Sequence, residues 1–239
     1  MNRSPLRYAP WMVRDFLRGP GVLMLGAIVL ASLIVSRLVI AGPDSGLVSP
    51  DGAMSGILAQ LSWPFVLLAT GGMVSTDRVQ GYYREIFSKP VRPATHYLIR
   101  WLVGAVAVGG SMPLIWAGVA LGPGRPRFEW SLLINLELTY LLLGGLVFLL
   151  STLFRWDWTP ALTMFAVEEA LGSALEHGFE LPWAARWVAA ALPPFHLANV
   201  TSPVPRGMDL VRVLLWGAAL VAAAVWVLRV KPMGSGGRA

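Results

Sequence analysis

Residues 132–153 read LLINLELTYLLLGGLVFLLSTL, a stretch that contains a single charged side chain. About 20 mainly apolar residues, at 1.5 Å of rise each, form a helix that crosses the roughly 30 Å hydrocarbon core of a bilayer. The same criterion finds five more segments, so the predicted spans are 21–41, 53–75, 98–121, 132–153, 159–177 and 209–228. The fifth is the least apolar, because Glu168 and Glu169 interrupt it. The sequence therefore predicts an all-α polytopic membrane protein in which residues 1–239 form one transmembrane domain.

The composition of the whole chain supports this class. Of its 239 residues, 56% are hydrophobic and only 13% are charged, whereas an ordinary soluble domain is about 25% charged. The mean hydropathy is +0.62. A compact soluble fold would expose apolar runs of a size that soluble surfaces do not carry, which excludes a soluble globular enzyme. The chain has no cysteine, which excludes disulfides and thiol chemistry.

The positive charges predict the orientation. Thirteen of the nineteen Lys and Arg residues lie in the N-terminal arm, between the second and third spans, after the fourth span and in the C-terminal tail. Cytoplasmic loops are enriched in these residues, so both termini are predicted to be cytoplasmic. The net charge of +6 sits at span ends and not along one aromatic-lined face. This placement predicts the lipid bilayer, and no nucleic acid, as a partner.

The N-terminal arm has the pattern of an amphipathic helix. Over residues 5–18 the apolar side chains recur at helical spacing, while Arg7, Arg14 and Arg18 fall together on another face. We expect an interfacial helix that begins near Pro10, because a proline in the first turn costs little. The alternative is an unstructured basic arm that anionic lipid attracts.

One long polar stretch, DRVQGYYREIFSKPVRPATHY at residues 77–97, separates the second and third spans. Pro90 and Pro93 prevent a helix from running through it, so a short helix should stop near Ser88 and another should restart into the third span. Its Tyr and Arg side chains are types that anchor protein interfaces. The alternative is a positively charged loop that only sets the topology.

This arrangement resembles the permease (transmembrane) subunits of ABC-2 type transporters. Their pattern is an acidic residue, a glycine, a short helix, and a Pro-Val-Ser/Thr-Arg element with an aromatic residue that leads into the third span. The matching residues are Asp77, Gly81, Pro90, Val91, Arg92 and Tyr97. The family usually has a glutamate three residues after the glycine, where this chain has Arg84 followed by Glu85.

The likeness extends over most of the chain. The family also has an N-terminal interfacial helix, six spans, and a Leu-Pro element before the last span, which Leu192, Pro193, Pro194, Phe195 and His196 resemble. In that family the region before the last span forms half-helices that dip into the outer leaflet. Residues 178–208 have Trp183 and Trp187 at helical spacing and suit such an element, and a plain external loop is the alternative.

The resemblance implies an exporter subunit of the bacterial-type inner membrane that works with a separate cytosolic ABC ATPase. That ATPase would bind ATP and Mg²⁺, and this chain, which has no P-loop sequence, is predicted to be neither an enzyme nor a cofactor-binding protein. A second permease, either another copy or a similar chain, would complete the membrane part. The residues implied to form the ATPase-coupling helix are Gly81, Tyr82, Tyr83, Arg84, Glu85, Ile86 and Phe87.

Carboxylates inside the predicted spans are the candidate substrate path. They are Glu137, Glu168, Glu169 and Glu176. A charged side chain near the bilayer centre costs about 2.5–3.5 kcal/mol on insertion scales, so it normally faces a cavity or a partner. One hypothesis is a polar path for an amphiphilic or cationic substrate, with Glu169 as the leading residue. The other is that these carboxyls hydrogen-bond between helices and fix their packing.

Two other function classes compete with a permease. A non-enzymatic membrane scaffold or assembly subunit would need no ATPase contact through residues 81–88. An ion-coupled secondary transporter would use the glutamates of the fifth span, although such transporters typically carry internal repeats. No metal site is predicted, because His96 is expected on the cytoplasmic side while His177 and His196 are expected outside.

Overall fold

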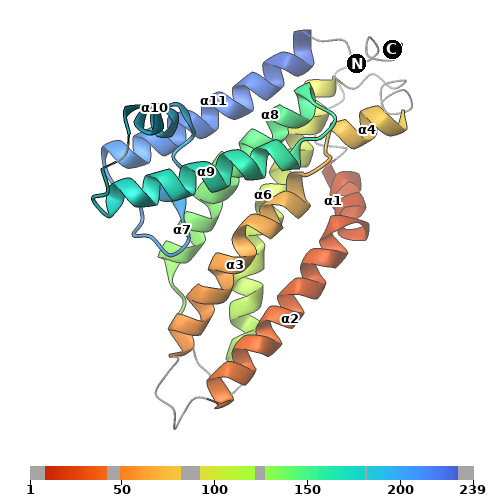
Figure 1. The fold of residues 1–239 in the computed structure, drawn as a ribbon. Helices are drawn as coiled ribbons and strands as arrows, with labels where there is room; N and C mark the ends of the chain where they lie inside the picture. Colours follow the sequence, from red (N-terminus) through yellow and green to blue (C-terminus); the bar gives the residue numbers. More distant parts are fainter. Residues whose placement is uncertain (1–8, 42–48, 82–91, 122–126, 181, 231–239) are drawn as a thin grey trace.

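The structure, a computed structural model, describes residues 9–41, 49–81, 92–121, 127–180 and 182–230. Helices joined by short connections make up this part of the chain, and no strand occurs in it (Figure 1). In chain order the elements are α1 (Ala9–Arg18), α2 (Pro20–Ala41), α3 (Pro50–Thr70), α4 (Ser75–Gln80), α6 (Pro93–Ala120), α7 (Trp130–Thr139), the π-helix η2 (Tyr140–Gly144), α8 (Gly145–Leu153), α9 (Trp158–Glu176), α10 (Trp183–Ala191), the 3₁₀ turn η3 (Phe195–Ala198) and α11 (Met208–Val230).

Five helices of the described residues are long and apolar enough to cross a membrane. They cover Pro20–Arg37, Asp51–Gln80, Pro93–Ala120, Trp130–Leu153 and Met208–Val230. The all-helical fold is thus confirmed, and these five helices coincide with five of the predicted spans, as is expected of a polytopic membrane protein. Helix α9 forms almost where the fifth predicted span, 159–177, was expected, but its Thr and Glu side chains leave it less apolar than these five helices. A sixth span at 159–177 therefore stays a prediction.

The second predicted span differs from expectation at its end. Residues 53–75 were expected to be continuous, but α3 ends at Thr70 and α4 begins at Ser75. Gly72 has a φ of 69°, a left-handed conformation that glycine adopts without strain. Its amide also donates a hydrogen bond to Asp157 instead of continuing the helix, so the chain bends between α3 and α4.

Helix α1 confirms the helix expected in the N-terminal arm. It packs against α6 and α2. Its buried side chains are Met12 and Phe16, while Trp11, Val13 and Leu17 are exposed. In Figure 1, α1 and α4 lie at the same end of the bundle, together with the connection between α8 and α9. We call this the α4 end, and it is the side that the positive charges predict to be cytoplasmic.

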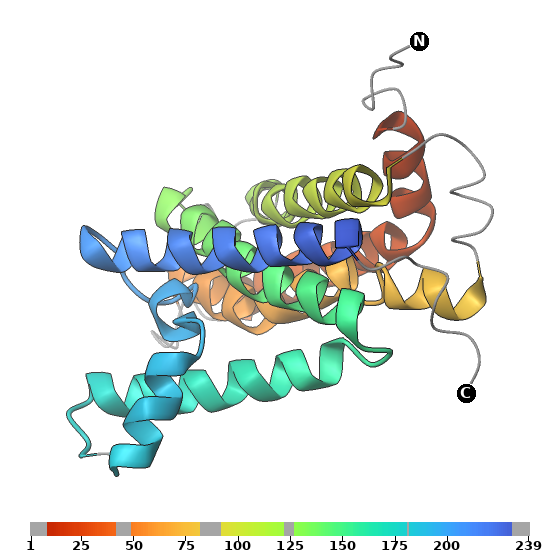
Figure 2. The ribbon, with the colours of Figure 1, turned by 90° about the horizontal axis from the view of Figure 1, so that it is seen from above.

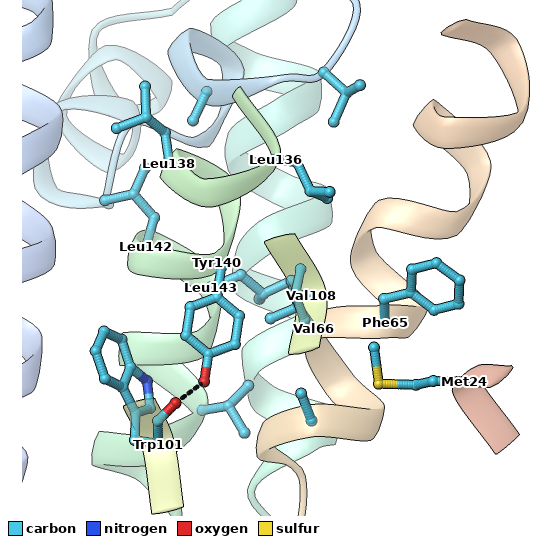
Figure 3. Packing of buried hydrophobic residues seen from close by; sticks show 14 of the residues in the cluster. Met24, Phe65, Val66, Trp101, Val108, Leu136, Leu138, Tyr140, Leu142 and Leu143 are labelled. Carbon is cyan, nitrogen blue, oxygen red and sulfur yellow. Dashed lines mark hydrogen bonds between the residues drawn. The ribbon is translucent and has the colours of Figure 1, made fainter. Parts of the chain in front are cut away.

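The best-buried part of the core lies where α3 and α6 pack on the continuous helical segment α7–η2–α8 (Figure 3). The Tyr140 hydroxyl donates a 2.5 Å hydrogen bond to the Trp101 carbonyl, so the π-helix is tied to α6. Gly104 on α6 makes room for that phenol, because a Cβ there would lie 2.6 Å from the Tyr140 oxygen. Helix α11 packs along α8, with Gly217 against the Leu141 side chain.

Helices α9 and α10 lie at one edge of the bundle, and α6 lies at the opposite edge (Figure 2). Helix α9 packs mainly against α8, α10 and η3. After α10 the chain turns back toward the bundle before α11. It passes through η3, which contacts both α7 and α9, before α11 begins. We call residues 192–207 the returning segment.

The packing of α6 on the π-helix gives a first prediction. Gly104→Ala should lower the free energy of unfolding by about 1–3 kcal/mol, because the added methyl group meets the buried Tyr140 hydroxyl and the Ala69 carbonyl oxygen. Gly110→Ala is the matched control on the same helix, since its Cβ would meet no atom within 4 Å. That control should be neutral or slightly stabilising, because Ala is the better helix former. Thermal unfolding in detergent micelles measures both variants, and equal midpoints would contradict the described contact.

Candidate functional site

The polar groups at the α4 end are organised around two buried carboxylates. The first is Asp77, the acidic residue of the recognised sequence pattern, which is 8% exposed. Its Oδ2 accepts hydrogen bonds from the Tyr97 hydroxyl and from the Arg100 guanidinium, both at 3.1 Å. The same guanidinium donates to the Met73 carbonyl at 3.3 Å. Asp77 and Tyr97, separated by 20 positions in the sequence, thus join α4 to α6.

The second buried carboxylate, Asp157, lies in the connection between α8 and α9 and is 2% exposed. Its Oδ1 accepts from the Trp158 amide at 2.9 Å and so caps α9. Its Oδ2 accepts from the Gly72 amide at 2.9 Å and from the Ser75 hydroxyl at 3.1 Å. One carboxylate therefore holds the start of α9 and the bend before α4 together.

Sequence reasoning missed Asp157. The local signal was present, because Asp157 directly precedes Trp158 and lies three residues before Pro160, a pattern that fits a helix N-terminus. That signal predicts the cap, but it gives no information about Gly72 and Ser75, which lie more than 80 positions away. A further contact strengthens the same junction, since the Arg78 guanidinium donates to the Thr152 carbonyl at 3.0 Å.

The residues predicted to couple to an ATPase follow directly after this junction. Helix α4 ends at Gln80, and Gly81 has a φ of 76°, a left-handed conformation that ends the helix. The other predicted coupling residues, 82–87, lie outside the described residues. Beside Gly81, a cleft of about 500 Å³ opens between α4 and the connection after α8. Its lining residues are Ser75, Thr76, Val79, Gln80, Arg155 and Trp156.

The glutamates of the predicted substrate path fall in two separate places. Glu168 is fully buried on α9 and faces the returning segment. Its Oε2 accepts from the His196 amide at 3.0 Å, and its Oε1 lies 2.5 Å from the His196 Nδ1. Gly172, one turn further along α9, leaves the space that the imidazole fills. Glu168 therefore holds the backbone and the side chain of His196 at once.

Glu169 is half-buried and also faces the returning segment. Its Oε1 accepts a 2.5 Å hydrogen bond from the Asn199 side chain. Glu176 is the last residue of α9, and its side chain lies outside the described part of the chain. Because α9 ends there, no face of this helix extends from Glu169 beyond Glu176.

The returning segment is held from its other side by α7. The Asn135 side chain donates to the Ser202 carbonyl and the Thr139 hydroxyl donates to the Ala198 carbonyl, both at 2.6 Å. These two residues are four positions apart and share one face of the helix. Sequence reasoning missed them, as it missed Asn199, although polar residues at that spacing in an apolar helix are a visible signal. It considered His196 only as part of the Leu-Pro element and as a metal ligand to be excluded, and not as the partner of Glu168.

Glu137 lies on α7 but does not join this cluster. It is two residues from Asn135, which places it about 200° around the helix and on the opposite face. There its carboxylate lies against Gly109 of α6, a position where a Cβ would collide with it. The side chain is half-buried and makes no hydrogen bond or ion pair with the described residues. The structure thus brings Glu168 and Glu169 together and leaves Glu137 apart.

Comparisons with known proteins add no assignment to this geometry. No protein-family model matches the chain, and no curated protein is significantly similar to it. The family resemblance therefore depends on the residue pattern of the sequence alone.

The Glu168–His196 contact gives a second prediction. Glu168→Ala and His196→Ala should each lower the free energy of unfolding by about 1–3 kcal/mol, because each leaves buried polar groups without a partner. The double variant should lose at least about 0.5 kcal/mol less than the sum of the two. Glu129→Ala with His196→Ala is the control pair, since Glu129 is exposed, and these two effects should add. Unfolding in micelles measures the free energy of unfolding of the single and double variants. If the effects of Glu168→Ala and His196→Ala simply add, a direct contact between the two residues is refuted.

Proposed function

We propose that this chain is the membrane-spanning permease subunit of an ABC-2 type exporter, and that a separate cytosolic ATPase drives it. The observation that carries the proposal is the hydrogen bond between Asp77 and Tyr97. These are the acid and the aromatic residue of the recognised pattern, and they are fixed to each other beside Gly81. A loop that only set the topology would need positive charge but no buried contact between these two residues.

The position of the junction also supports the proposal. Asp77 ties α4 to α6, and Asp157 ties the bend before α4 to α9. A partner that bound the segment after Gly81 would therefore act on a helix that is connected to two parts of the bundle. ATP and Mg²⁺ would be bound by that partner. The membrane unit would be completed by a second permease in the inner membrane, with the α4 end in the cytoplasm.

The ATPase contact gives a third prediction. In membranes that contain the partner, the double variant Tyr83→Ala/Arg84→Ala should reduce the co-purified ATPase by at least about tenfold, because aromatic and Arg side chains often contribute most of an interface's binding energy. The matched control is Arg186→Ala/Trp187→Ala, an adjacent Arg and aromatic residue exposed on α10. The control should retain the ATPase. Equal retention by both variants would contradict docking through residues 81–87 and would favour the scaffold hypothesis.

The path hypothesis for Glu169 gives a fourth prediction. Glu169→Gln keeps a carbonyl oxygen for the Asn199 side chain, so its unfolding midpoint should equal that of the wild type. Removing the charge should nevertheless lower the ATPase rate of the permease–ATPase complex in native-lipid vesicles by about fivefold or more, a typical size for coupling between sites. Glu129→Gln, an exposed glutamate at the start of α7, is the control. An unchanged ATPase rate in Glu169→Gln would leave only the packing role.

A further inference from the structure

Helix α9 is held at two places that lie far apart along its length. At its first residue, the Asp157 carboxylate accepts from the Trp158 amide and from the Gly72 amide and Ser75 hydroxyl of the α3–α4 bend. Ten residues later, Glu168 accepts from the His196 amide and contacts its ring. At 1.5 Å per residue these two anchor points are about 15 Å apart along one continuous helix.

Apolar packing holds α9 as well, because Ala161 is fully buried and the Phe165 ring contacts the Phe195 ring of η3. Helix α9 packs mainly on α8, α10 and η3, and it lies at the edge of the bundle (Figure 2). Of these neighbours, η3 is itself held by Glu168 and by the Thr139 hydroxyl. A displacement of α9 along its axis would therefore act directly on the returning segment, through the Glu168 and Glu169 hydrogen bonds and the contact between the Phe165 and Phe195 rings.

The bend between α3 and α4 contains two glycines and can change its angle. Gly71 and Gly72 join α3 to α4, and Gly72 is in the left-handed region. The Gly72 amide makes no helical hydrogen bond, because it is bonded to Asp157, while the Gly72 carbonyl accepts from the Thr76 amide at 3.0 Å and so moves with α4. A movement of α4 relative to α3 would thus change the contacts of the Asp157 carboxylate and, through it, act on the start of α9.

We infer that Asp157 is a positioning residue that couples the α3–α4 bend to the returning segment through α9, with Glu168, near the middle of that helix, as the matching contact. The coupling is defined by buried hydrogen bonds at two points of one continuous helix, so a perturbation at one point changes the stability of the other. Thermodynamic linkage requires the effect to run equally in both directions. The inference depends on these contacts and not on the proposed ATPase, so the two can fail independently.

Hydrogen exchange of the full chain in lipid nanodiscs tests this inference. Asp157→Asn should speed the exchange of amides 195–199 by at least about fivefold, as well as that of amides 72–78. The milder Ser75→Ala removes one of the three hydrogen bonds to Asp157 and should produce the same pattern at smaller size. In the reverse direction, Glu168→Gln should speed the exchange of amides 72–78. Amides 58–66 of α3 serve as the internal reference, because a general loss of stability would change them too.

Asp77→Asn is the matched control. It weakens the connection of α4 to α6 through Tyr97 and Arg100 but leaves the Asp157 contacts in place. It should speed exchange within α4, and it should change amides 195–199 less than Asp157→Asn does, because the Asp157 contacts that hold the start of α9 remain. The inference is overturned if Asp157→Asn and Ser75→Ala loosen amides 72–78 while amides 195–199 exchange at the wild-type rate. It is equally overturned if Asp77→Asn loosens the returning segment as much as Asp157→Asn does.

Discussion

A carboxylate that is removed from water needs hydrogen-bond donors inside the protein, and this requirement fixes how the connections fit around the apolar helices. Asp77, Asp157 and Glu168 are all buried, and each accepts hydrogen bonds from another segment of the chain. Asp77 and Asp157 hold the segments at the α4 end together, and Glu168 holds the returning segment within the bundle. Apolar packing brings the long helices together, but it does not by itself determine where these short segments lie.

The polar contacts divide the bundle into parts with different roles. Helix α6 and the α7–η2–α8 segment form the tightly packed centre, where glycines admit large side chains such as Tyr140. Helix α9 lies at the edge and depends on polar contacts at its start and near its middle. That difference explains why α9 has fewer apolar residues than the five membrane-length helices. Its acidic residues are required for contacts with the returning segment, even though they lower its suitability for lipid.

The long helices could be predicted from the sequence because their signal is local. A run such as residues 132–153 predicts its own helix, and the structure extends that helix only to Trp130. The end of α3 was harder to predict, because the donor at Gly72 is bonded to a residue that lies 85 positions further along the chain. The α10 helix and its end before Pro193 followed from tryptophan spacing and proline chemistry.

The candidate site was predictable only in part. The pattern singled out Asp77, Gly81 and Tyr97 from their order, and the hydrogen bond between Asp77 and Tyr97 gives that order a physical reason. The intramembrane glutamates could be found from their cost in a bilayer. Their partners could not, because His196 and Asn199 belong to a segment whose position depends on tertiary contacts. Composition likewise could not distinguish Glu168, which is fully enclosed, from Glu137, which faces Gly109.

Together these features describe an apolar helical bundle with a polar junction at one end and a polar contact that holds a returning segment within it. The central claim is that a separate ATPase binds the segment after Gly81 and drives the chain through the polar junction of Asp77 and Asp157. The most direct measurement is mild-detergent purification of the tagged full chain from its native membrane, with identification of the co-purifying proteins and an assay of ATP hydrolysis. The account predicts a P-loop ATPase in an amount comparable to the chain, with ATP hydrolysis by the complex. Recovery of the chain alone, or with membrane proteins that bind no nucleotide, would contradict it.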